Sequence, residues 1–143
     1  MKPTPPGWPR MSASVHYEDP LAALDWLCQA FGFEVRQKIV ADGKLEHSEL
    51  VYGDAVIMLG TAGGQEKPWQ KLQKSPRTAG GVTHALAFYT DDVDTHHARA
   101  VAAGAQIILE PQTNDYGPDF WTDRTYGALD PEGHLWWFMQ RLR

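Results

Sequence analysis

The stretch Tyr17-Glu-Asp-Pro-Leu21, which continues to Ala30-Phe-Gly-Phe-Glu34, decides the fold because the chain repeats its plan further on. The counterpart is Tyr89-Thr-Asp-Asp-Val93, which continues to Ala102-Ala-Gly-Ala-Gln106. Both tyrosines and both glycines of these stretches are separated by 72 positions, so the offset stays constant across a whole helix. An internal repeat fixes the architecture before any single residue does. The sequence therefore predicts two copies of one module.

Each copy carries the signals of one helix. Asp19 can cap the first helix, and Pro20 falls at its first position, where a missing N–H costs nothing. Asp91 or Asp92 can cap the second helix. Each copy then has a glycine where a left-handed C-terminal cap is expected. Apolar positions recur at helical spacing at Leu21, Leu24, Leu27, Cys28 and Phe31, and more weakly at Val93, His97, Ala100 and Val101.

One β-rich run precedes each predicted helix and three follow it. In the first copy the runs are Ser12–Tyr17, Phe33–Ala41, Glu46–Tyr52 and Ala55–Leu59. In the second copy they are Val82–Tyr89, Gln106–Glu110, Asp123–Leu129 and His134–Gln140. The plan is βαβββ twice. We expect one domain over residues 1–143, with module one at about 11–60, a connector at 61–81 and module two at about 82–140.

Composition excludes several classes of partner. The chain has 143 residues, enough for one domain with a substantial core, and its single cysteine, Cys28, excludes an intramolecular disulfide. No apolar run reaches the length of about 18 residues that predicts a membrane span. The net charge of -5 arises from interspersed acids and bases, and no basic stripe is present to bind a phosphate backbone. We expect a cytoplasmic protein that binds neither membranes nor nucleic acid.

The duplicated plan, together with several local motifs, resembles the vicinal oxygen chelate superfamily of glyoxalases, bleomycin resistance proteins and dioxygenases, in particular its uncharacterised glyoxalase-like subgroup. The resemblance implies an α+β fold in which two βαβββ modules form an incompletely closed eight-stranded barrel around a cleft. Helices would lie on the convex side, and the protein would form a homodimer. The motifs that carry the resemblance are at residues 30–34, 47–59, 91–105, 115–117 and 123–138.

The metal-binding positions of the metal-using branches can be counted onto this chain. They fall on Ser12, Ala85 and Trp137, and near Met58. None of these side chains is a good ligand for a divalent transition metal. His84 is one residue out of register, and a shift of one residue turns a strand side chain to the opposite face. The resemblance therefore predicts a glyoxalase-like protein without the standard metal site and without a cofactor.

Alternation along the strands predicts the lining of the cleft, because residues that share parity with the former ligand positions face it. The cleft would be apolar and aromatic, which suits a planar or hydrophobic small molecule. The residues selected are Ser12, Ser14 and His16, then Ala85, Ala87 and Tyr89, and finally Leu135, Trp137 and Met139.

A few polar and aromatic residues are further candidates. His47 and Glu49 could form a polar pair or, with His16, a nonstandard metal cluster, and the favoured interpretation is a solvated or hydrogen-bonded trio. Arg124 could bind a substrate carboxylate or pair with Asp123 or Asp130. Four candidates lie in and after a long loop that could cover the cleft: Tyr116, Trp121, Arg124 and Tyr126. The ligand-binding candidates are His16, His47, Glu49, Tyr89, Tyr116, Trp121, Arg124, Tyr126 and Trp137.

The remaining reactive or aromatic side chains are expected to be structural. Trp26 and Trp136 would pack in the core, and Cys28 would be a core residue rather than a nucleophile. His96 and His97 are adjacent on a helix and cannot chelate one ion as an i, i+4 pair would. His134 would pack or hydrogen-bond on the convex side.

Three functions remain open at this point. The first is binding or sequestration of a small organic ligand without metal. The alternative is a divalent-metal-dependent lyase, isomerase or dioxygenase that uses His16, His47 and Glu49. The third is a structural or interaction role for the dimer. No catalytic residue is assigned.

Overall fold

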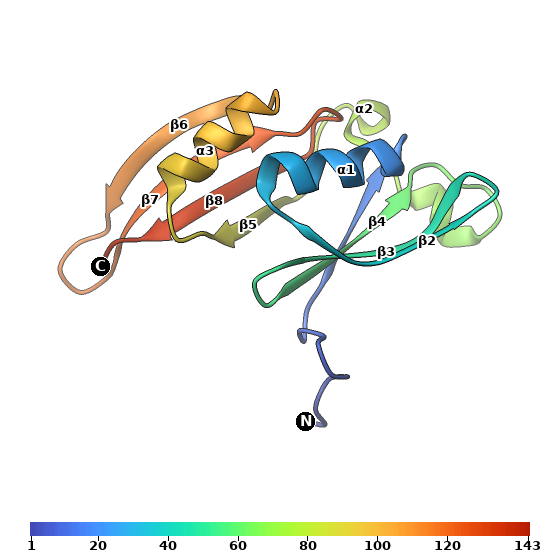
Figure 1. The fold of residues 1–143 in the computed structure, drawn as a ribbon, viewed down its shortest axis with the longest axis horizontal. Helices are drawn as coiled ribbons and strands as arrows, with labels where there is room; N and C mark the ends of the chain where they lie inside the picture. The colour runs from blue at the N-terminus through green and yellow to red at the C-terminus, as the bar shows by residue number, and fades with distance from the viewer. The chain divides into compact units, whose positions relative to one another are not determined.

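Each half of the chain folds into one four-stranded mixed sheet with a helix packed on one face (Figure 1). The computed structural model describes all residues, 1–143, and they divide into unit one, residues 1–75, and unit two, residues 76–143. The units are described separately below. The predicted α+β class and the repeated βαβββ plan are confirmed by the order of the elements.

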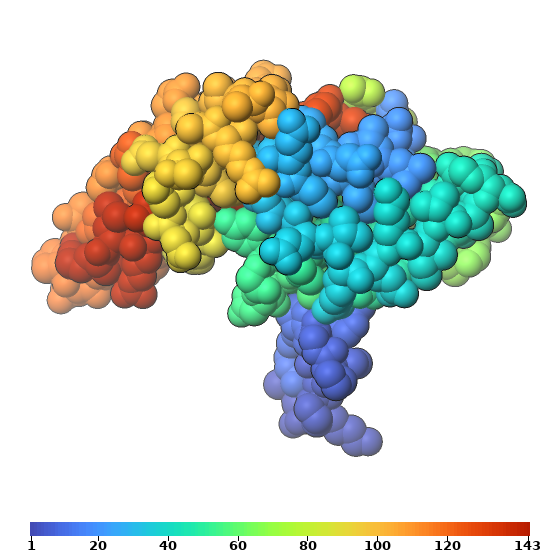
Figure 2. All heavy atoms as spheres, viewed as in Figure 1, coloured from blue at the N-terminus to red at the C-terminus, as the bar shows by residue number.

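Unit one contains β1 (Ala13–Tyr17), α1 (Pro20–Phe31), β2 (Glu34–Ala41), β3 (Lys44–Tyr52), β4 (Ala55–Thr61) and the 3-10 helix η1 (Pro68–Leu72). The strands lie in the order β1-β4-β3-β2, with β1 parallel to β4 and the other pairs antiparallel. The N-terminal residues project away from this sheet (Figure 2, dark blue).

Unit two repeats this arrangement with the short helix α2 (Pro76–Ala79), β5 (Ala85–Tyr89), α3 (Val93–Ala102), β6 (Gln106–Asp115), β7 (Thr122–Leu129) and β8 (Leu135–Arg141). The strands lie in the order β5-β8-β7-β6, again with one parallel pair, β5 and β8. No helix in residues 1–143 is both long and apolar enough to span a bilayer.

Both predicted helix caps form. The Asp19 carboxylate accepts a hydrogen bond from the Ala22 amide at 3.0 Å, and Asp92 accepts one from the Thr95 amide at 3.1 Å. Each bond satisfies an amide that has no partner inside the helix. Gly32 ends α1 at a φ of 78°, in the left-handed region that glycine adopts without a steric penalty.

The core of each unit lies between its helix and one face of its sheet. In unit one, Leu27 and Phe31 of α1 are fully buried, as is Leu50 of β3. In unit two, the predicted core residue Trp136 is fully buried with Phe138. Trp26 and Cys28 were expected in the core but are only half-buried, because the apolar stripe of α1 is wider than the strip that contacts the sheet.

Strand β6 is longer than predicted. It continues past Glu110 to Asp115, because its backbone pairs with β7 as far as the Asp115–Thr122 pair. The register shifts between Leu109 and Gln112, where Pro111 cannot donate to the ladder. The expected long loop is therefore only the hairpin connection at residues 116–121. The predicted connector also differs, because it contains η1 and α2, each of which begins at a proline.

The turn before β8 is held by one buried carboxylate. Asp130 is 5% exposed, and its Oδ1 accepts hydrogen bonds from the Glu132 and His134 amides at 3.0 and 3.1 Å. Its Oδ2 accepts the indole N–H of Trp136 at 3.0 Å. Asp130 thus fixes both the backbone of the turn and the largest side chain of the unit-two core.

We predict that Asp130→Asn lowers the free energy of unfolding by about 3 kcal/mol, because an amide replaces a charged acceptor and turns an N–H toward one of its former donors. Urea unfolding followed by tryptophan fluorescence measures the change. The exposed Asp119→Asn, elsewhere in unit two, is the matched control and should stay within about 0.5 kcal/mol of the parent. Equal stability of the two variants would contradict the assigned role of Asp130.

Candidate functional site

The sheet of unit two has an open face, the face opposite α3, on which Trp137 is the central ring. Neighbouring strand residues in register share a face, and Trp137 lies between Ala87 of β5 and Gly127 of β7. Both neighbours are small. A Cβ atom on Gly127 would come within 2.6 Å of the Trp137 ring, so this ring lies directly against the β7 backbone. The next row on the same face contains Tyr89, which is 57% exposed.

Three more aromatic rings gather at the tip of the β6–β7 hairpin. The ring centroids of Tyr116 and Trp121 are 5.4 Å apart, and those of Phe120 and Trp121 are 6.3 Å apart. All three side chains are exposed. Single exposed rings are ordinary, but a contiguous group marks a site of interaction.

Asp123 connects this hairpin tip to the open face. It is 3% exposed, and its carboxylate accepts hydrogen bonds from Asn114 Nδ2 at 3.0 Å, Thr125 Oγ1 at 3.1 Å and the indole N–H of Trp121 at 3.3 Å. Partial burial raises the pKa of the Tyr116 phenol, and the Asp123 carboxylate raises that pKa further. The charge of Tyr89 also contributes to the rise.

We call the group formed by Tyr89, Tyr116, Trp121 and Trp137, with Asp123 beneath it, the aromatic face. Two of the predicted ligand-binding candidates, Tyr89 and Trp137, therefore lie on the open face of this sheet, and two more, Tyr116 and Trp121, lie at the tip of its β6–β7 hairpin. Asp123 was not predicted as a site residue. The signal that would have found it is the alternation Trp121, Asp123, Thr125 and Gly127 along β7, which places these residues on the face of Trp137.

Two candidates lie on the other face of the same sheet. Tyr126 is fully buried, stacks on Phe138 and makes a hydrogen bond of 2.6 Å with Nδ1 of His96 on α3. Arg124 donates two hydrogen bonds, at 2.9 and 2.8 Å, to Asp94 at the start of α3. Both side chains point toward the helix because they lie opposite Gln140 and Phe138 of β8, on the face that packs against α3. The partners considered for Arg124 from the sequence, Asp123 and Asp130, are not the ones that it binds.

In unit one the candidates His47 and Glu49 are joined in a polar chain. His47 Nε2 lies 3.0 Å from one oxygen of Glu49, and Arg36 Nε donates to the other at 2.7 Å. These two bonds hold the pKa of Glu49 below its usual value. The guanidinium of Arg36 also donates to the Gly7 carbonyl and lies 4.7 Å from the centre of the Trp8 ring. Neither Arg36 nor Trp8 was predicted as a partner of this pair.

His16 is not a hydrogen-bond partner of His47 or Glu49. Its ring is placed over Gly60, where a Cβ atom would be 3.0 Å from His16 Cδ2, and its Nε2 is 3.5 Å from Ser14 Oγ. Residues 1–143 contain no group of three His, Cys, Asp or Glu side chains arranged to hold a metal ion. Both oxygens of Glu49 already bind cationic or polar groups, so the trio does not form the nonstandard cluster that the sequence left open.

The residues at the family's metal positions do not fit a divalent ion either. Met58 lies opposite Ser14 and Trp137 lies opposite Ala87, so these two rows offer a thioether, a hydroxyl, an indole and a methyl group. Neither of these two cross-strand residue pairs supplies an imidazole or a carboxylate. His84 precedes β5, is exposed, and has its ring 6.4 Å from that of the buried His134.

This geometry defines a two-module α+β protein with an aromatic face and without a recognisable metal centre. The family model of the Glyoxalase/Bleomycin resistance protein/Dioxygenase superfamily matches residues 13–138, and the chain belongs to that superfamily. An uncharacterized protein of Mycobacterium tuberculosis, Rv0887c, is 31% identical over 140 residues, which cover 94% of this chain and 76% of the relative.

Solved structures agree with this assignment. TioX from Micromonospora sp. ML1 is 32% identical with a TM-score of 0.69, and the match covers 92% of this chain and 95% of TioX. TnmS3, an antibiotic binding protein from Streptomyces sp. CB03234, has a TM-score of 0.66 at 19% identity and covers 93% and 96% of the two chains. The second likeness shows a shared fold.

The Arg124–Asp94 pair yields a pH-dependent prediction. The hydrogen bonds from Arg124 lower the pKa of Asp94 below its ordinary value of 3.8. A carboxyl whose pKa is lowered by folding stabilises the protein above its unfolded-state pKa, and this contribution is lost as pH falls through the folded-state value. We predict that Arg124→Gln is less stable than the parent at neutral pH. This difference in stability should disappear once the pH falls below the folded-state pKa of Asp94.

Urea unfolding at a series of pH values measures this difference. Lys38→Gln is the control, because Lys38 is 3.9 Å from Asp25 and forms only a loose surface pair. It should show no such pH-dependent difference. A constant difference between Arg124→Gln and the parent down to the lowest pH would show that Arg124 acts by packing rather than through Asp94.

Proposed function

We propose that this protein binds and sequesters a planar aromatic small molecule on the aromatic face of unit two. The observation that carries the proposal is the arrangement of Trp137, a half-buried ring that lies against Gly127 between small neighbours on the sheet face opposite α3. A flat ligand can stack on this face, which runs from Trp137 along β7 to the Trp121 and Tyr116 rings at the hairpin tip.

Stacking of a flat ligand on these rings is energetically favourable. Aromatic pairs contribute about 0.5–1.5 kcal/mol beyond the area that they bury. The hydrogen bond from Trp121 to Asp123 fixes one ring before the ligand arrives, which reduces the entropy lost on binding. A few polar groups among rings, here the Tyr89 and Tyr116 hydroxyls, are typical of a small-molecule site.

The comparisons support a binding role without naming a ligand. TnmS3 is described as an antibiotic binding protein, and it shares the fold of this chain. Because that identity is only 19%, the choice of a planar aromatic ligand rests on the residues of this chain alone. The alternative of a metal-dependent enzyme has no comparable observation in its favour, because His16, His47 and Glu49 do not converge.

We predict that Trp121→Ala weakens binding of proflavine, a planar tricyclic dye, about tenfold, which corresponds to about 1.4 kcal/mol. Asp123→Asn should weaken it less, because the amide keeps one acceptor for the indole N–H. Fluorescence titration of the dye at about 0.15 M salt measures the affinity and limits nonspecific attraction to the acidic chain. Trp69→Ala removes an exposed tryptophan from unit one, 56% exposed against 41% for Trp121, and should leave the affinity unchanged. Unchanged affinity in Trp121→Ala would overturn the proposal.

We further predict that protein purified without chelators contains less than about one divalent ion per ten chains, because no set of three suitable donors converges. Inductively coupled plasma mass spectrometry measures the content. A stoichiometric ion that is lost in His47→Ala would restore the enzymatic alternative. A stoichiometric ion retained in that variant would show that other residues bind it.

A further inference from the structure

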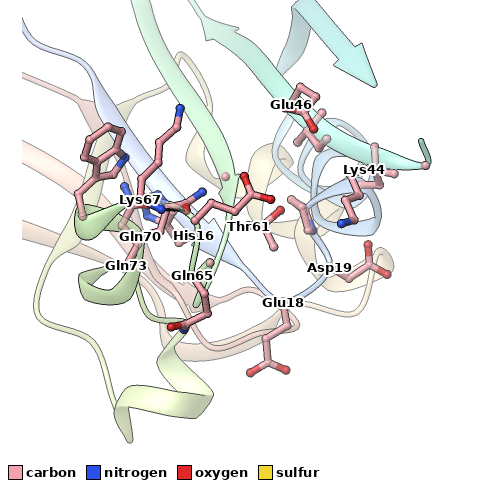
Figure 3. Close-up of a pocket in the computed structure, with 18 residues that line it drawn as sticks. His16, Glu18, Asp19, Lys44, Glu46, Thr61, Gln65, Lys67, Gln70 and Gln73 are labelled. Atoms are coloured by element: carbon pink, nitrogen blue, oxygen red, sulfur yellow. Dashed lines mark hydrogen bonds between the residues drawn. The ribbon is translucent and has the colours of Figure 1, made fainter. Parts of the chain in front are cut away.

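We propose a second binding site, in unit one, for a polyhydroxylated cation such as an amino sugar. The site is a cavity of about 680 Å³ between α1, the ends of β1, β3 and β4, and the segment that follows β4 (Figure 3). Its volume lies within the range of small-molecule sites. The proposal is independent of the aromatic face, because every residue that lines the cavity belongs to unit one.

The segment that follows β4 forms one wall of the cavity, and hydrogen bonds hold it in a defined fold. The Ala62 amide donates to the Tyr17 carbonyl at 2.8 Å, and the Gly63 amide donates to the Gln73 carbonyl at 2.7 Å. The Lys67 amide donates to Gln70 Oε1 at 2.8 Å and so begins η1. A Cβ atom on Gly64 would lie 2.8 Å from the Gln70 side chain, so glycine at this position allows the loop to close on itself.

Most of the cavity lining is polar. Some of its groups already bind other parts of the protein: Glu18 accepts a hydrogen bond from Ser75 at 2.7 Å, and Asp19 caps α1. Lys44 and Glu46 instead reach the cavity from β3 without a hydrogen bond or ion pair to the protein (Figure 3). The polar groups that remain available for a ligand are Lys44, Glu46, Thr61, Glu66 and Gln73.

This lining indicates a ligand with many hydroxyl groups. Amide, carboxylate and ammonium groups together supply both donors and acceptors, and a planar apolar ligand would remove them from water without replacing their hydrogen bonds. Trp69, at the edge of the cavity, is 56% exposed, with Lys67 Nζ 5.4 Å from its ring centre. An exposed ring beside polar groups provides an apolar surface for the C–H face of a sugar ring.

The charge of the lining selects a cation. Four carboxylates, of Glu18, Asp19, Glu46 and Glu66, face two ammonium groups, of Lys44 and Lys67. A negative lining attracts an amino-substituted ligand and disfavours a phosphorylated or uronic one. The expected occupant therefore carries ammonium groups among its hydroxyls.

The test uses the full chain and three probes: kanamycin as a cationic amino sugar, maltotriose as a neutral trisaccharide and proflavine for the aromatic face. Backbone amide shifts in ¹H–¹⁵N spectra at about 0.15 M salt report both the affinity and the place of binding. We expect kanamycin to shift cavity residues, with at least tenfold preference over maltotriose. Trp69→Ala and Glu46→Gln should each weaken kanamycin binding severalfold.

Matched controls separate this site from nonspecific attraction. Glu34→Gln removes an exposed carboxylate on β2 outside the cavity and should leave kanamycin affinity unchanged, as should Trp121→Ala. Proflavine should show the converse, sensitive to Trp121→Ala and indifferent to Trp69→Ala. Absence of kanamycin shifts at millimolar concentration, equal binding of maltotriose, or an equal effect of Glu34→Gln and Glu46→Gln would overturn the proposal, whatever proflavine does.

Discussion

Each four-stranded sheet of this protein has one long helix of its own unit to cover it, so the helix buries only one of the two faces. Side chains alternate along a strand, and the buried face therefore fixes the direction of every other residue. In β1 the burial of Val15 and Tyr17 sends Ser14 and His16 to the open face. In β8 the burial of Trp136 and Phe138 does the same for Trp137 and Met139. The chemistry of each open face follows from the packing of its opposite face.

The two units apply this constraint to different side chains. In unit one the open face carries the His47–Glu49 pair. The Glu49 carboxylate forms an ion pair with Arg36, and the Arg36 guanidinium in turn lies against the Trp8 ring. In unit two it carries aromatic rings and a single buried carboxylate, Asp123. The same topology thus presents a closed polar chain in one copy and a group of aromatic rings in the other. Function in such a protein lies in the residues placed on the fold and not in the fold itself.

The sequence predicts the local features of this structure well and the long-range ones less well. The helix caps at Asp19 and Asp92 depend on residues three positions apart in the sequence. Because the module is repeated, the same capping signal occurs in both copies. The length of β6 depends instead on its pairing with β7, which sequence periodicity does not report. Arg124 was misplaced for the same reason, since its direction follows only once the register of β7 against β8 is known. Trp69 and its neighbours were taken as connector because a 3-10 turn has no apolar period.

The position of Trp137 shows how the aromatic surface and the missing metal ligand are physically linked. The resemblance places a metal ligand at this residue, where a carboxylate would need donors in the adjacent strands to orient it. Its actual neighbours are Ala87 and Gly127, which have no polar side chain and leave room for a broad ring. A carboxylate at position 137 would lie between two small residues that offer it no side-chain hydrogen-bond donor. The space that the indole now fills would become a cavity. A metal ligand at this position would therefore require changes on both neighbouring strands, and those changes would remove the surface on which we propose that a planar ligand stacks.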